Sequence, residues 1–183
     1  ASLLLALPLA WLTLPHQARA EVELAAHGGY AREFDPSVRG DLGPYGVGLG
    51  GRGGALFHRF YFGAWFEGFF GTRQSAKGTG VSYDASSQAW FLGPEVGYDV
   101  HLGERFMLRP LLGFGLRRLT GHTAVNSLRI NDASSNVYLV TGALGAVRLG
   151  RVFVGPELRC LLTPLDLPNA WAPMLSLVAG VRL

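Results

Sequence analysis

Cysteine occurs only once in this sequence, at Cys160, and neither sign of charge is in clear surplus. One cysteine excludes an intramolecular disulfide and any metal cluster built from several thiolates. The 16 lysines and arginines stand against 13 aspartates and glutamates, a balance too even to indicate nucleic acid as a partner. No long helical pattern is present either, which favours a fold built from strands.

Only one long apolar run occurs, from Leu3 to Leu14, and Pro8 interrupts it. A membrane-spanning helix needs about 20 apolar residues, so this run is too short to be an anchor. It is followed by Ala18-Arg19-Ala20, the small-x-small pattern of a signal-peptidase site. We therefore predict a signal peptide over residues 1–20, with the printed sequence beginning inside it, and a single domain over residues 21–183.

The stretch FYFGAWFEGFFG, residues 60–71, is rich in aromatic residues but contains one carboxylate, Glu67. Successive side chains of a strand point to opposite faces. On that basis one face is wholly apolar, and it consists of Phe60, Phe62, Ala64, Phe66, Gly68 and Phe70. The other face mixes small, aromatic and charged groups, and an ionised carboxylate there needs a partner because an unpaired buried charge is costly. The pattern predicts a strand with lipid on one side.

Eight segments of this kind are bounded by turn residues. They cover approximately residues 22–34, 44–54, 60–71, 88–101, 106–118, 137–148, 152–162 and 173–183. The connections between them alternate between long and short, and the long ones are 35–43, 72–87, 119–136 and 163–172. The 26 glycines are spread through the segments, as expected where strands bend around a small barrel. The fold class predicted is all-β, an eight-stranded antiparallel up-and-down barrel that spans the outer membrane.

Charged residues in the predicted strands share the face opposite the apolar one. By this parity the inward acids are Glu23, Glu67, Glu95, Asp99 and Glu157, and the inward bases are Arg52, Arg109, Arg117, Arg148, Arg159 and Arg182. A barrel of eight strands is just wide enough for side chains to fill. We predict a lumenal charge network that contains Glu67, Glu95, Glu157, Arg52, Arg109, Arg117 and Arg159, because the arginine fork binds carboxylates in pairs. His27 and His101 are expected to join it as polar partners.

Aromatic residues on the apolar face fall at two levels. We predict that Tyr30, Phe34, Phe70 and Trp90 form a belt near the outer rim, and that Phe60, Phe62, Tyr98 and Phe106 form a belt near the periplasmic rim. Such belts occur at the two interfaces between headgroups and hydrocarbon. The lone Cys160 shares the lipid-facing parity and is predicted to be a small packing residue.

With these patterns the chain resembles the eight-stranded outer-membrane barrels of Gram-negative bacteria, the group that contains the OmpA transmembrane domain and OmpX. The last strand, MLSLVAGVRL, resembles the signal that the barrel-assembly machinery recognises, with Leu183 where a Phe is usual. The resemblance implies an integral, monomeric outer-membrane protein without cofactor or metal, whose partners are outer-membrane lipid and lipopolysaccharide. It implies a structural or surface-interaction role.

Two other functions are weighed against this one. Some eight-stranded barrels modify lipid A, and His122 and Ser127 lie in a predicted outer connection, but the deacylase pattern His-x-Ser-Asn is not matched. A secreted, lipocalin-like ligand carrier has an apolar interior, whereas the charges here are predicted to point inward. The bases expected at the outer end either contact lipopolysaccharide phosphates or are simply solvated, and they are Arg32, Arg39, Arg73, Lys77, Arg118 and Arg129.

Overall fold

The computed structural model describes residues 20–33, 43–78, 81–126, 128–162 and 171–183. The predicted signal peptide and the connection around residues 34–42 therefore lie outside the described residues, apart from Ala20. The described part of the chain contains no helix long and apolar enough to cross a membrane.

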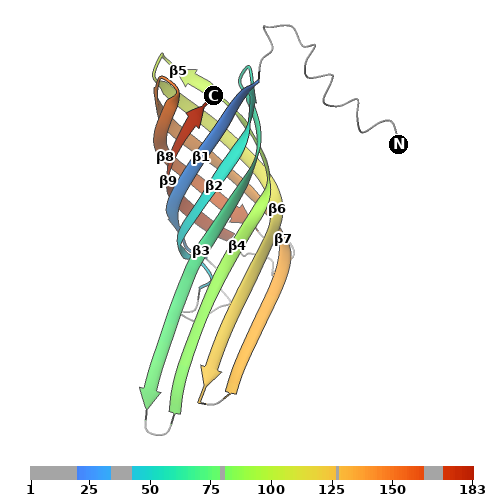
Figure 1. The fold of residues 1–183 in the computed structure, drawn as a ribbon, viewed down its shortest axis with the longest axis vertical. Helices are drawn as coiled ribbons and strands as arrows, with labels where there is room; N and C mark the ends of the chain where they lie inside the picture. Colours follow the sequence, from blue (N-terminus) through green and yellow to red (C-terminus); the bar gives the residue numbers. More distant parts are fainter. Residues whose placement is uncertain (1–19, 34–42, 79–80, 127, 163–170) are drawn as a thin grey trace, which may run out of the picture.

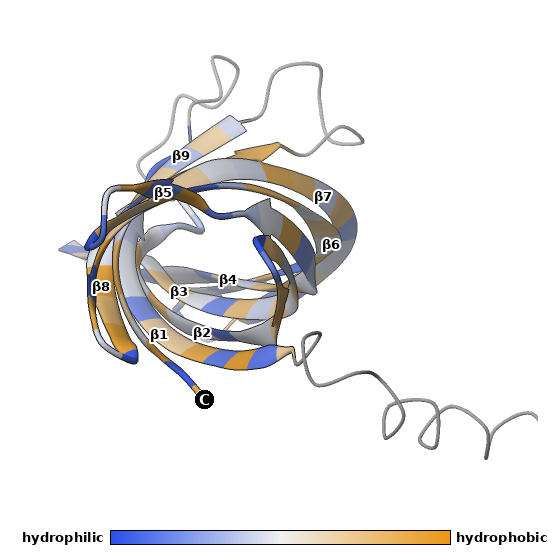
Figure 2. Ribbon diagram, turned by 90° about the horizontal axis from the view of Figure 1, so that it is seen from above, coloured by the Kyte–Doolittle hydropathy of each residue, from blue (hydrophilic) through white to orange (hydrophobic). Residues whose placement is uncertain are grey.

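Within the described residues nine strands follow one another, and all strands that pair with each other are antiparallel. They are β1 (Glu21–Ala31), β2 (Gly46–Phe57), β3 (Phe60–Gly78), β4 (Val81–Tyr98), β5 (Val100–Leu102), β6 (Phe106–Val125), β7 (Leu128–Leu149), β8 (Val152–Leu162) and β9 (Trp171–Arg182). Strand β5 continues β4 after a one-residue interruption at Asp99, and both pair with β6. The β1–β9 and β4–β6 ladders complete the ring, so the fold is a closed eight-stranded barrel, as predicted (Figures 1 and 2).

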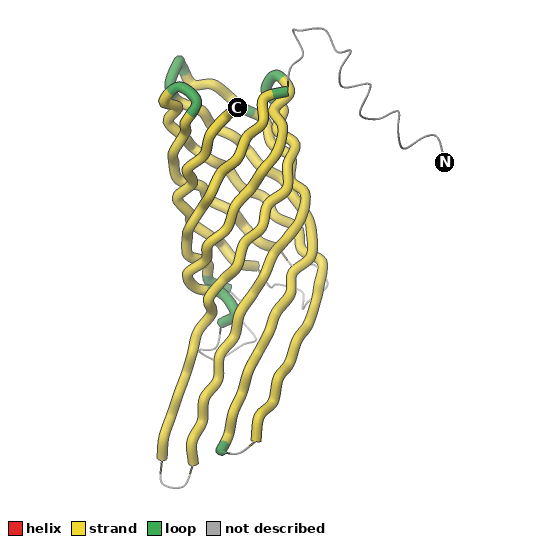
Figure 3. Tube along the Cα trace, viewed as in Figure 1, coloured by secondary structure: helices red, strands yellow, loops and turns green. Residues whose placement is uncertain are grey.

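Three connections are tight turns at the end of the barrel where the chain termini lie (Figure 3). Each turn contains one residue with a positive φ, namely His58 at 58°, Gly103 at 83° and Gly150 at 66°. Left-handed backbone of this kind is what allows so short a reversal, and glycine adopts it without strain. The predicted short connections are thus confirmed.

Two of the predicted long connections are wrong. Residues 72–78 and 81–87 continue β3 and β4, and most of residues 119–136 continue β6 and β7. Pairing of β3 with β2 stops at Phe70, and pairing of β7 with β8 stops at Leu139, yet the four strands remain paired with one another. They form an extension, a four-stranded sheet that projects beyond the barrel at the end opposite the termini (Figure 1). A register shift between Phe70 and Arg73 marks where β3 leaves the barrel.

Alternation along the strands separates two environments. Side chains of one parity are buried inside, and those of the other parity are apolar and exposed on the outer wall, as with Leu112, Leu175 and Leu177. In β7 the even residues Tyr138, Val140 and Leu144 are the buried ones, in agreement with the inward parity predicted for Arg148. A barrel with an exposed apolar wall and a buried polar interior has the inverted arrangement that a lipid environment selects.

Candidate functional site

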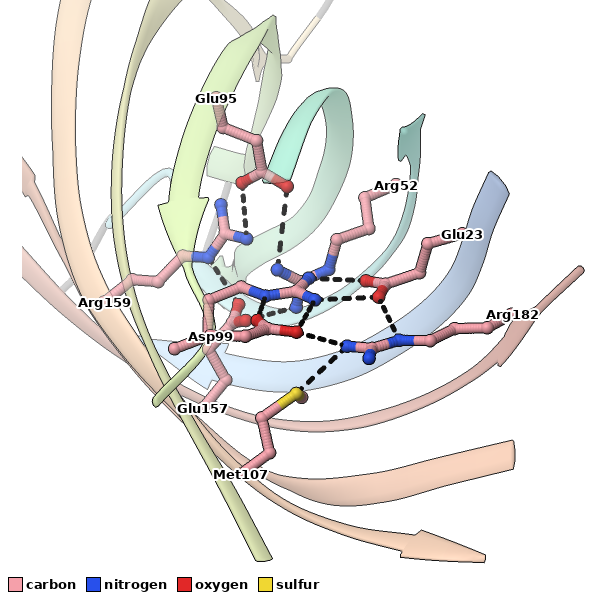
Figure 4. Close-up of polar contacts among 9 residues, drawn as sticks. Glu23, Arg52, Glu95, Asp99, Met107, Glu157, Arg159 and Arg182 are labelled. Carbon is pink, nitrogen blue, oxygen red and sulfur yellow. Dashed lines mark hydrogen bonds and ion pairs between the residues drawn. The ribbon is translucent and has the colours of Figure 1, made fainter. Parts of the chain in front are cut away.

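The seven residues predicted for the interior network are all buried on the inner face, with exposed fractions of 4% or less. They share that face with Glu23, His27 and Asp99, which are equally buried. Figure 4 shows the side chains of Glu23, Arg52, Glu95, Asp99, Glu157, Arg159 and Arg182 projecting from strands around the ring and meeting one another. Their contacts form two clusters of acids and arginines. Two further pairs, Glu67 with His27 and Arg117 with Tyr45, lie outside these clusters.

The first cluster lies near the chain termini and is centred on Arg109. Its Nη1 and Nη2 atoms donate to the two carboxylate oxygens of Glu23 at 2.5 and 2.8 Å, and its Nε donates to Asp99 at 2.5 Å. Arg182 also donates to both acids, at 3.0 Å to Glu23 and 2.6 Å to Asp99. Two carboxylates and two guanidinium groups therefore neutralise one another, and Arg182 is the one member of the cluster that is partly exposed. The Arg109 guanidinium also stacks on the ring of Tyr61, 4.4 Å from its centre.

The second cluster joins Glu95 and Glu157 to Arg52 and Arg159. Arg159 donates to Glu95 at 2.9 Å and also to Glu157, while Arg52 donates to Glu157 and lies 3.6 Å from Glu95. The count of two acids and two bases is again balanced. The Arg159 guanidinium covers the face of Trp65 at 4.2 Å. Because charged hydrogen bonds of this type are the strong ones, each member depends on its neighbours to remain buried.

Glu67 does not belong to either cluster. Its Oε2 lies 2.5 Å from Nε2 of His27, so its partner is a histidine and not one of the arginines we had expected. The two residues are separated by one strand, where Gly50 is the cross-strand neighbour of both. A Cβ at Gly50 would collide with the imidazole, so the glycine is what lets the pair meet across the strand. The contact between His27 and Glu67 could not be predicted from sequence spacing, because it depends on the register of three strands.

This difference in partner leads to a prediction about Glu67. Because an imidazole can be neutral, replacing Glu67 by Gln leaves no obligatory unpaired charge behind. We expect Glu67→Gln to lower the free energy of unfolding by roughly 1–3 kcal/mol, the usual cost of depriving a buried polar group of its partner. Reversible urea unfolding in lipid vesicles measures it. Glu157→Gln is the matched comparison and should cost clearly more, since it deprives two arginines of a carboxylate; equal losses would contradict the assignment of His27 as partner.

Aromatic side chains occupy the interior toward the extension. Trp65, Phe69, Phe91 and Tyr138 pack with Tyr45, and the ring centres of contacting pairs are 5.0–6.1 Å apart. The hydroxyl of Tyr45 accepts a hydrogen bond from Arg117 at 3.2 Å. Tyr45 falls inside the predicted strand 44–54, but it precedes β2 in the structure, so strand parity did not mark it as an interior residue. On the side of the termini a second apolar group includes Leu56, Met107 and Phe153.

Seven of the eight residues predicted for the aromatic belts lie on the outer wall. Tyr30 and Phe70 share one cross-strand row through Val47, and Trp90 lies close by at the same end. Phe60 and Tyr98 pair across strands at the other end, with ring centres 4.9 Å apart, and Phe62 and Phe106 are exposed there as well. Phe34 lies outside the described residues. The role of these rings at membrane interfaces stays a prediction.

The extension carries the polar groups considered for lipid chemistry. His122 is in β6 and not in a loop, its Nδ1 lies 2.8 Å from Oδ1 of Asn131, and Ser86 is its cross-strand neighbour on β4. Ser127 lies outside the described residues. Arg73 forms a two-pronged ion pair with Asp84, and this hydrogen bonding holds the pKa of Asp84 below its ordinary value. Across the described ranges, no group of His, Cys, Asp and Glu could hold a metal ion.

Comparison with known proteins identifies the fold. No protein-family model matches the chain, and no curated protein matches its sequence. Among solved structures, the attachment invasion locus protein Ail of Yersinia pestis superposes with a TM-score of 0.61 at 13% identity, over 90% of this chain and 99% of Ail. Neisserial surface protein A gives 0.56 at 13% identity, over 88% and 97% of the two chains.

The N-terminal barrel of Pseudomonas aeruginosa OprF gives a TM-score of 0.52 at 14% identity, over 91% of this chain and 99% of that one. Identities this low establish the fold and leave the activity open. They agree with the barrel geometry, the apolar outer wall and the resemblance seen in the sequence. The chain has the fold of the eight-stranded outer-membrane β-barrels, the group to which the OmpA transmembrane domain and OmpX belong.

Proposed function

We propose that this protein is an integral outer-membrane barrel with a filled lumen, which serves a structural or surface-interaction role and is not a porin. The observation that carries the proposal is the pairing of the buried charges. Both clusters balance acids with arginines, and the aromatic group of Trp65, Phe91 and Tyr138 lies between them and the extension. A lumen occupied in this way offers no continuous path to hydrated ions.

The distribution of polarity supports a membrane protein over a soluble carrier. A lipocalin-like barrel keeps an apolar cavity for its ligand, whereas the interior here holds Glu23, Arg109 and Glu157 with no exposed surface. An exposed apolar wall of this extent is unfavourable in water and favourable in hydrocarbon. The predicted signal peptide over residues 1–20 and the alternating last strand support export and insertion by the barrel-assembly machinery.

A surface role is supported by the extension. It lies at the end opposite the three short turns, the end that is extracellular in outer-membrane barrels. Ail, which shares the fold, is described as an attachment invasion locus protein and has been solved with the heparin analogue sucrose octasulfate. We propose that this protein acts through its extracellular end, as a monomer, with lipid and lipopolysaccharide as its membrane partners and without a catalytic step.

Conductance measurements test the filled lumen. In planar lipid bilayers we expect no large, steady conductance from the folded protein, because the paired charges and packed rings leave no aqueous path. A porin inserted under the same conditions is the positive control. Insertion of the protein itself is verified by the heat-dependent shift in its gel mobility, a property of folded barrels. Large open channels that scale with the amount of inserted protein would contradict the proposal.

A further inference from the structure

Charge on the extension is divided between its two faces. The outer face, which continues the lipid-facing wall of the barrel, carries four bases and one acid among the described residues: Arg73, Lys77, Arg118, Arg129 and Asp84. The inner face carries Asp132 and, beyond the buried Arg117 next to Arg118, no base across the described positions. A sheet that only met water would have no reason to sort its charge by face. The bias indicates an anionic surface on the outer side.

The outer wall of the barrel next to this basic face is apolar and contains a groove. This groove has a volume of about 490 Å³ and is lined mainly by Phe66, Trp90, Leu92 and Leu116. Arg118 lines it on the side of the extension. Trp90 and Arg118 are cross-strand neighbours, and the Trp90 ring packs against Phe66 with centres 5.4 Å apart. An apolar groove that ends beside a tryptophan and an arginine matches the junction between acyl chain and charged headgroup.

Farther along the extension, beyond Arg118, the same face contains a polar cleft of about 530 Å³. Arg73, His122 and Arg129 contribute to its lining, together with Asn131. Asp84 neutralises part of the charge of Arg73, while Arg118 and Arg129 have no acid as cross-strand neighbour. The row of Trp90 and the row of Arg129 are six residues apart along β4 and β6, which corresponds to about 20 Å of strand.

We propose that groove and cleft together bind a phosphorylated glycolipid of the outer leaflet, with an acyl chain in the groove and phosphates on Arg118, Arg73 and Arg129. A phospholipid carries its single phosphate next to the glycerol, so it would reach Arg118 and leave the bases farther along the strands unused. An extended headgroup with several phosphates reaches the whole face. The inference rests on the proposed function, because it requires the extension to stand at the outer leaflet.

Equilibrium binding of fluorescently labelled lipopolysaccharide to the full chain in zwitterionic micelles tests the site. The variant combines Arg73→Gln, Arg118→Gln and Arg129→Gln. A basic side chain near an anionic lipid surface contributes about fivefold in affinity, so we expect a loss on the order of a hundredfold. The matched control removes three bases from the short turns at the other end, with Arg59→Gln, Arg105→Gln and Arg151→Gln, and should bind within about twofold of the original. The single variants are measured alongside.

Several results would overturn the inference. Retained affinity in the first triple variant, or equal losses in both, would show that these side chains form no site. Equal affinity for phosphatidylglycerol would show that an extended headgroup with several phosphates is not required. Efficient competition by inorganic phosphate would indicate that the site binds a soluble anion and not a lipid. Heat-dependent gel mobility and conductance are recorded on the same samples. If the original protein is a folded, non-conducting barrel and one of these results is found, the lipid site alone is overturned. If the original protein conducts or does not fold as a barrel, the proposed function is overturned.

Discussion

Replacing Arg109 by Met is expected to lower the free energy of unfolding of the barrel by roughly 3–5 kcal/mol, the usual cost of removing one partner from a buried ionic group. Arg109 makes four hydrogen bonds to Glu23 and Asp99 and is itself completely buried. Without it, two carboxylates would share the single guanidinium of Arg182. Reversible urea unfolding in lipid vesicles gives the change directly.

The same experiment contains its controls. Combining Arg109→Met with Asp99→Asn leaves Glu23 and Arg182 as a balanced pair, so part of the lost stability should return. Arg105→Met changes an exposed side chain in the preceding turn and should leave the free energy of unfolding almost unchanged. A loss below about 1 kcal/mol for Arg109→Met would mean that water reaches this cluster, contrary to its burial.

Phe66→Arg should destabilise the barrel for a different reason. Phe66 lies on the outer wall, midway along β3 between Phe62 and Phe70 of the two aromatic levels. An arginine on the lipid face near the bilayer midplane costs about 2–4 kcal/mol, and this cost falls to about 0–1 kcal/mol near the interfaces. Urea unfolding in vesicles should show the loss, and no change to the interior clusters should repair it.

Ser75→Arg provides the matched control for Phe66→Arg. It places the same side chain on the same strand and face, but beyond the outer aromatic level and within the extension. We expect it to be tolerated. If Phe66→Arg were tolerated as well, the outer wall of β3 would not face hydrocarbon at that level, and the placement of the barrel in the membrane would have to change.

Most of the barrel follows from alternation alone. Because a strand has a period of two, the parity of Glu67, Glu95 and Arg159 was enough to predict that each would be buried. The extension was not predicted in this way, since residues 72–80 are mostly polar and only the short run of Val81, Tyr83 and Ala85 alternates with polar residues. The partner of each buried charge was harder to predict than its burial. Glu67 meets His27 and not an arginine because Gly50 leaves room between them, and that depends on a three-strand register.

The ion pairs inside the barrel connect parts of the chain that are far apart in sequence. Arg109 is 86 residues from Glu23, Arg52 is 105 residues from Glu157, and Arg182 is 159 residues from Glu23. None of these contacts can form in an isolated hairpin, so a partly assembled sheet must keep its charges hydrated. Contacts of such long range slow folding, because loop closure comes before any gain from the contact. Expulsion of water from the interior is therefore a late event in biogenesis, coupled to the meeting of β1 with β9.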